Sequence, residues 1–123
     1  MHALSGRPRH LLMMADAVGG VWTYALDLAE ALAPLGTRTT LAVLGPLPPA
    51  RRAEAEARGL ALVETGWPLD WLAGDDAEVR EAGRGVAALA ARLGVDLVQL
   101  NSPALASAAR FPCPVLGVCH SCL

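Results

Sequence analysis

The feature that most constrains the fold of this chain is a glycine pair, Gly19-Gly20, between a mostly apolar run and a helical pattern. The apolar run over residues 10–15 predicts a buried strand. After the glycines, apolar residues recur at helical spacing and predict a helix over residues 20–35. The expected buried stripe of this helix consists of Val21, Ala25, Leu28, Leu32 and Leu35.

A strand that passes through glycines into a helix can bind an anion. The first N–H groups of a helix have no partners within the helix, and the helix dipole is positive at that end. Glycine has no Cβ, so a ligand can approach the backbone closely. The alternative is structural, because such a junction also needs glycine for a tight turn or for close packing of the helix on the strand.

Strand and helix patterns alternate along the whole chain. Strands are predicted over residues 9–15, 37–44, 60–64, 95–100 and 115–119, and helices over 20–35, 50–58, 76–93 and 103–110. This alternation predicts an α/β fold, a Rossmann-like parallel sheet with helices on both faces. Right-handed crossovers favour the strand order 3-2-1-4-5. Residues 1–123 read as a single domain without repeats.

Composition excludes several classes of protein. Hydrophobic residues make up 54% of the 123 positions, which argues against disorder. The 10 basic and 12 acidic residues give no electrostatic case for binding nucleic acid. Charged residues interrupt each apolar run, so neither a membrane span nor a signal peptide is expected, and the cytoplasm is the expected location. Three cysteines do not suggest a disulfide scaffold.

The topology predicts where a ligand would bind. In open parallel sheets, ligands bind beyond the carboxyl ends of the strands, where the strand order reverses. Here that point lies between the first and fourth strands, so residues 16–20 and Asn101-Ser102 should lie beside it. His120 and Ser121 follow the fifth strand at the same edge. Asn101 and Ser102 also have a structural interpretation, as a turn and a helix cap.

Other known motifs are absent or weak. The glycine pattern is not G-x-G-x-x-G, because Val18 and Thr23 occupy two of the glycine positions. No G-x-x-x-x-G-K-[ST] loop is present, since the chain contains no lysine. The C-x-x-C at residues 119–122 has neither the helix context of a redox motif nor common zinc spacing, so no metal site is predicted.

The tryptophans and glycines in the second half have structural interpretations, and the tryptophans also have functional ones. Trp67 and Trp71 lie in an irregular segment and either pack the loop, line an acceptor pocket or contact a membrane surface. Gly83 and Gly85 weaken the predicted helix, and close packing on the sheet is the simplest reason for them.

The charged residues of the first two helices are expected to lie at the surface. Asp27 and Glu30 should lie on the outer face of the first helix. Glu54 and Arg58 have the spacing of a surface ion pair.

Three segments are more informative together than singly. Residues 19–36 read GGVWTYALDLAEALAPLG, residues 95–102 read VDLVQLNS and residues 119–121 read CHS. In this order they resemble the N-terminal half of retaining glycosyltransferases of family 4, which have the GT-B fold. Thr37, Gln99 and Asn101 depart from the resemblance, because the family usually has histidine at these positions.

The resemblance implies a transferase that moves a sugar from a nucleotide-sugar to an acceptor hydroxyl with retention. Gly19 and Gly20 would lie near the donor diphosphate, and His120 would position the transferred sugar. Asn101, Ser102 and Ser121 are the other candidate substrate contacts. No cofactor beyond the nucleotide-sugar co-substrate is implied, and no protein nucleophile.

The resemblance also implies a second domain that holds most of the nucleotide contacts. We therefore expect these 123 residues to be the acceptor-side part of an enzyme, truncated after the fifth strand and inactive alone. Contact with a membrane surface through the acceptor is compatible with this interpretation. A non-catalytic nucleotide- or phosphate-binding module is the alternative. A receiver domain is disfavoured, because it would need clustered acids after the first strand and a lysine after the fifth.

Overall fold

The computed structural model describes residues 8–17, 20–67, 76–100 and 110–117. Within them, five parallel strands form one sheet in the order β3-β2-β1-β4-β5, which confirms the predicted Rossmann-like α/β topology. The strands are β1 (His10–Asp16), β2 (Arg38–Leu44), β3 (Ala61–Glu64), β4 (Leu97–Leu100) and β5 (Val115–Gly117).

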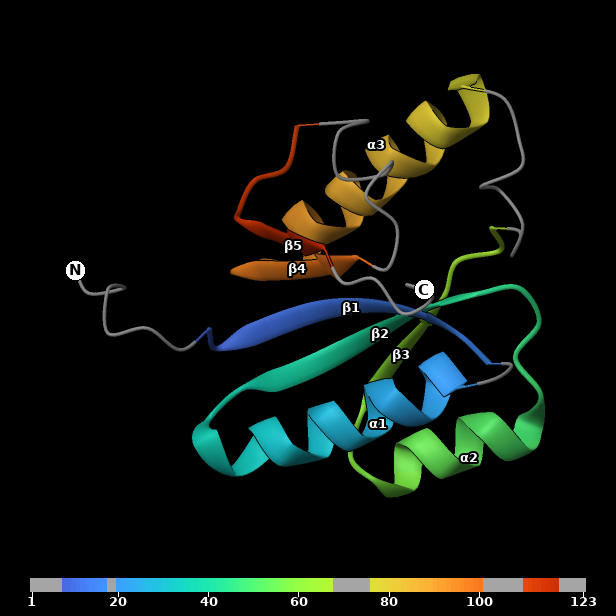
Figure 1. Ribbon diagram of the computed structural model, residues 1–123, viewed down its shortest axis with the longest axis vertical. Coiled ribbons are helices and arrows are strands. Elements are labelled where there is room, and N and C mark those ends of the chain that lie inside the picture. Colours follow the sequence, from blue (N-terminus) through green and yellow to red (C-terminus); the bar gives the residue numbers. More distant parts are fainter. Residues whose placement is uncertain (1–7, 18–19, 68–75, 101–109, 118–123) are drawn as a thin grey trace, which may run out of the picture.

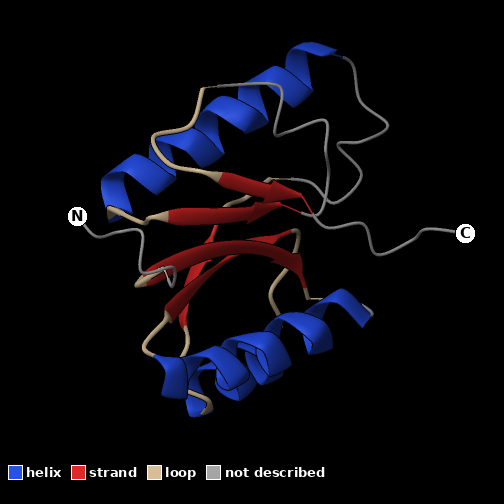
Figure 2. Cartoon of the chain, turned by 60° about the vertical axis from the view of Figure 1, so that its left-hand side comes forward, coloured by secondary structure: helices blue, strands red, loops and turns tan. Residues whose placement is uncertain are grey.

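Helices cover both faces of the sheet. Helices α1 (Gly20–Leu32) and α2 (Pro49–Ala57) lie on one face and α3 (Asp76–Leu93) lies on the other (Figures 1 and 2). The described strands and helices begin within two residues of their predicted starts. The helix predicted over residues 103–110 lies outside the described residues. Among the helices that are described, none combines the length and apolar character needed to cross a bilayer.

Alternating side chains of the strands build two cores. In β1, Leu12 and Met14 face α3, whereas Leu11, Met13 and Ala15 face α1 and α2. Each of these side chains is almost fully buried. This alternation follows from the two-residue period of a strand whose two faces are both covered.

The buried stripe of α1 differs from the predicted one. Its fully buried residues are Trp22, Ala25, Leu26 and Ala29, whereas Val21, Leu28 and Leu32 are only partly buried. Leu35 is half exposed. The α-helix ends at Leu32 and continues as a 3₁₀ turn, η2 (Ala33–Leu35), so Leu35 leaves the helical register. At the start of the helix, the large Trp22 side chain is buried in place of the adjacent Val21.

A hydrogen-bonded network joins the starts of β1, β2 and β4 at the amino edge of the sheet. The Asp96 carboxylate accepts hydrogen bonds from the backbone N–H groups of Arg9 and His10, each at 2.9 Å. Arg38 Nη2 donates to His10 Nδ1 at 3.3 Å, so His10 Nε2 carries the proton and donates to Thr40 Oγ1 at 2.8 Å. Burial, with the charge of Arg38, lowers the pKa of His10 despite the opposing charge of Asp96. The imidazole is therefore a neutral structural group.

The same network determines where β4 begins. Gly94 has a left-handed φ of 68° and ends α3, and Val95 N–H donates to Ala90 O at 3.2 Å in the terminal turn. Asp96 then binds the start of β1 with its side chain. Pairing in β4 consequently begins at Leu97 and not at the predicted residue 95.

Candidate functional site at the carboxyl edge of the sheet

The carboxyl ends of β1, β4 and β5 meet at one edge of the sheet. Strands β1 and β4 are neighbours, with Met13 opposite Gln99, and Leu100 at the end of β4 lies opposite Gly117 of β5 (Figure 1). The chain segments that carry the predicted site residues therefore start from one edge. Gly20 is the predicted site residue that the structure describes, and it begins α1 at this edge. The others lie outside the described residues: Gly19, Asn101, Ser102, His120 and Ser121.

Gly20 is not required by the fold of the described chain. Its φ lies outside the left-handed region, so an L-amino acid could adopt this conformation. Apart from its chain neighbours and the backbone of its own helix, no atom of the described residues would lie within 4 Å of a Cβ added to Gly20. Close helix–strand packing by the described residues is therefore not the reason for glycine at position 20, whereas the tight-turn alternative for the Gly19-Gly20 pair stays open, because Gly19 lies outside the described residues. The absent side chain leaves open space beside the first turn of α1, where the helix dipole is positive.

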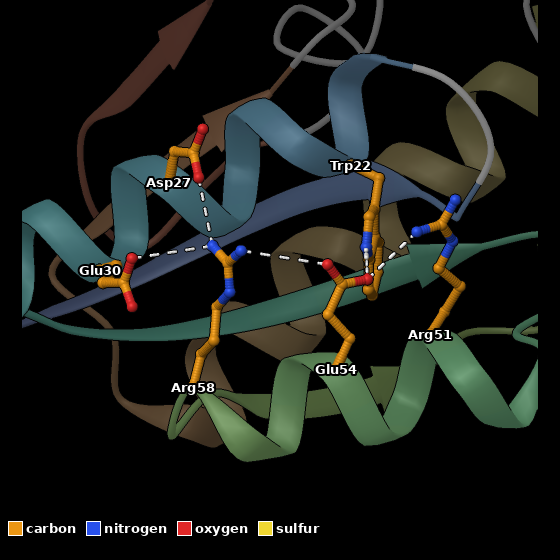
Figure 3. Close-up of polar contacts among 6 residues, drawn as sticks. All are labelled: Trp22, Asp27, Glu30, Arg51, Glu54 and Arg58. Carbon is orange, nitrogen blue, oxygen red and sulfur yellow. Dashed lines mark hydrogen bonds and ion pairs between the residues drawn. The ribbon is translucent and has the colours of Figure 1, made fainter.

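The first turn of α1 is anchored to α2 by a buried tryptophan. Trp22 has no exposed surface, and its Nε1–H donates to Glu54 Oε1 at 3.0 Å (Figure 3). Arg51 Nη1 donates to the same carboxylate oxygen at 3.1 Å. These two hydrogen bonds lower the pKa of Glu54 and keep the carboxylate ionised. Because Trp22 is two residues after Gly20, this anchor holds the first turn of α1 in place.

The predicted ion pair between Glu54 and Arg58 forms at 4.0 Å, but it is the weakest contact of a larger cluster (Figure 3). Arg58 Nη1 lies closer to Asp27, at 3.1 Å, and to Glu30, at 3.8 Å. Asp27 and Glu30 are exposed on the outer face of α1, as predicted. The contact of Glu54 with Trp22 has no local signal in the sequence, because 32 residues separate the two.

Gln99 connects β4 to α1 near the same edge. Its side chain is 97% buried, and Nε2 donates to Tyr24 Oη at a long 3.4 Å. In the family resemblance this position is usually histidine. The amide occupies the same face of the sheet as α1, since Leu97, two residues earlier, packs in that core.

The described residues provide no metal site. They contain no cluster of three or more His, Cys, Asp or Glu side chains that could hold an ion. Cys113 is a half-buried free thiol whose pKa is raised by burial and by the charge of Asp96. The C-x-x-C motif at residues 119–122 lies outside the described residues.

The topology and the glycine junction define a Rossmann-like α/β domain with a candidate anion site at the carboxyl edge. Residues 18–123 match the family model of Glycosyltransferase Family 4. Because the match covers most of the chain, the protein belongs to glycosyltransferase family 4. No match was found among curated proteins.

Two solved structures have the same fold. A glycosyltransferase from Rickettsia africae ESF-5 is 19% identical with a TM-score of 0.66, and the similarity covers 88% of this chain and 28% of that one. The glycotransferase of kitacinnamycin is 22% identical with a TM-score of 0.57, covering 91% and 30%. The chain thus spans less than a third of the length of either protein.

Proposed function

We propose that this domain is the acceptor-side part of a retaining glycosyltransferase that transfers a hexose from a nucleotide-sugar to an acceptor hydroxyl. The observation that carries the proposal is the open space at Gly20. Family membership supplies the reaction class. A helix N-terminus beside unoccupied space suits the diphosphate that departs from the donor.

In this proposal, the bond from the anomeric carbon to the diphosphate breaks while a bond to the acceptor oxygen forms on the same face of the sugar, and the proton of the acceptor hydroxyl passes to the departing diphosphate. The N–H groups of Gly19 and Gly20 stabilise the charge that develops on the diphosphate. His120 positions the transferred sugar, and Asn101, Ser102 and Ser121 contact the substrates. A second domain provides the remaining nucleotide contacts, consistent with the greater length of the two structural relatives.

The test is to replace Gly20 with alanine in the enzyme and to measure release of UDP, GDP or ADP from the corresponding nucleotide-hexoses. The added Cβ should occupy the space of the diphosphate and lower the rate by at least about tenfold, because a displaced anion loses oriented N–H donors. Folding stability should change by less than about 1 kcal/mol, since alanine is the better helix former.

Ala31→Ser is the matched control. It also adds one heavy atom to an exposed position of α1, about 16 Å further along the helix. This variant should retain the wild-type rate. Full activity of Gly20→Ala would exclude the proposed phosphate contact. Binding of a nucleotide by the wild type without release from any of the three donors would favour a non-catalytic binding module.

A further inference from the structure

A groove lies on the α3 face of the sheet, away from α1 and the glycine junction. Its volume is about 230 Å³, and it runs between the end of β3 and the inner side of α3. Glu64 and Trp67 line it from the β3 side, and Gly85, Ala88 and Arg92 line it from α3. Small residues on the helix leave the space between the tryptophan and the arginine open.

Trp67 forms one wall of this groove. Its backbone N–H donates to Thr65 Oγ1 at 3.1 Å, and its carbonyl oxygen accepts a hydrogen bond from Gly45 N–H at 2.8 Å. The indole lies against Gly85, where a Cβ would come within 2.5 Å of Trp67 Cζ2. The sequence predicts that Gly85 packs on the sheet, and this prediction is wrong. The neighbour that requires glycine at position 85 is the Trp67 side chain. The wall is already in place before a ligand binds.

Within the described residues, the two donor groups that line the groove are not used by other side chains. Among the residues that the structure describes, none accepts a hydrogen bond from the Trp67 indole N–H, and none pairs with the Arg92 guanidinium. Arg92 lies in the last turn of α3, where a positive charge suits the helix dipole. The Glu64 carboxylate binds Arg52 at 3.2 Å but remains half exposed.

We propose that this groove binds a neutral hexose unit. A pyranose ring has an apolar face that can pack on an indole and hydroxyls that both donate and accept hydrogen bonds. The indole N–H and Arg92 would donate to those hydroxyls, and Glu64 would accept from them. A phosphorylated sugar fits less well, because the Glu64 carboxylate lines the same groove. That the hexose belongs to the acceptor rests on the function proposed above, whereas the binding itself does not.

The experiment is a titration of the protein with methyl α-glucoside, methyl α-mannoside and methyl α-galactoside, followed in the indole region of a ¹H–¹⁵N NMR spectrum. A single sugar in an open groove should bind with a Kd of about 1 mM or weaker. We expect the Trp67 signal, assigned with Trp67→Phe, to shift and saturate with at least one glycoside. The Trp22 signal should not move, because its N–H is bound to Glu54 on the opposite face. Glucose 6-phosphate should bind more weakly than the neutral sugar.

Two pairs of exposed α3 positions provide matched variants. Ala88→Leu fills the groove and should abolish the shift, whereas Ala91→Leu lies outside it and should not. Arg92→Gln should weaken binding by about tenfold through loss of a charged donor, and Arg84→Gln should leave it unchanged.

An unshifted Trp67 signal with all three glycosides, or an unchanged affinity in Ala88→Leu, would overturn the proposal. Tighter binding of glucose 6-phosphate than of the neutral glycosides would also overturn the proposal, because the preferred ligand would then be anionic. None of these titrations contains a nucleotide. A negative titration therefore does not contradict the function proposed from Gly20, and a negative nucleotide-release test does not contradict sugar binding in the groove.

Discussion

Trp22 and Trp67 lie on opposite faces of the same sheet and have different surroundings. On the face covered by both α1 and α2, Trp22 is fully buried and its N–H is bound to Glu54. On the other face, which α3 covers, the half-buried Trp67 lines a groove between β3 and α3, and its N–H has no partner among the described residues. One residue type thus fills the core where two helices meet and lines a groove where one described helix packs on the sheet.

The largest expected effect distinguishes the two tryptophans by stability. Trp22→Ala removes a fully buried side chain and should lower the free energy of unfolding by about 3–5 kcal/mol. Trp67→Ala should cost only about 1–2 kcal/mol, because part of that side chain already contacts solvent. Urea unfolding of both variants measures the difference, and equal losses would show that Trp67 is as much a core residue as Trp22.

A medium effect is expected at the glycine beneath Trp67. Gly85→Ala should destabilise the fold by about 1–3 kcal/mol despite the better helix propensity of alanine, because its Cβ collides with the indole. Gly20→Ala, with no atom nearby, is the control and should be close to neutral. In a Trp67→Leu background, Gly85→Ala should cost little or nothing in thermal or urea unfolding. An equal loss in that background would mean that Gly85 packs on something other than Trp67.

The smallest effect concerns two adjacent threonines on opposite faces. Thr40→Val removes the acceptor of the buried His10 Nε2–H and should cost about 1–2 kcal/mol. Thr39 has a buried hydroxyl without a partner among the described residues, so Thr39→Val should be neutral or stabilising by up to about 1 kcal/mol. Equilibrium unfolding of the pair checks this. A destabilising Thr39→Val would reveal a partner for that hydroxyl.

The order of the elements could be predicted because local patterns encode it. Apolar runs of strand length alternate with helical spacing, and right-handed crossovers leave one favoured strand order. The candidate site followed from topology, since carboxyl ends of parallel strands share an edge. The roles of all its residues, Gly20 included, stay predictions.

The details of helix packing could not be predicted in the same way. The spacing of apolar residues in α1 is compatible with two adjacent buried stripes. The sequence does not show that Trp22 is buried and that Leu35 is half exposed. The choice depends on the 3₁₀ turn at Ala33–Leu35 and on the Glu54 carboxylate of another helix.

By itself, the sequence determined the α/β fold, the strand order and the position of the glycine junction, because each depends on residues close together in the chain or on a general rule of chain connection. Tertiary structure alone decided that Gly20 faces open space while Gly85 faces an indole. The two glycines look alike in the sequence. What a missing side chain leaves room for depends on atoms that folding brings from distant parts of the chain.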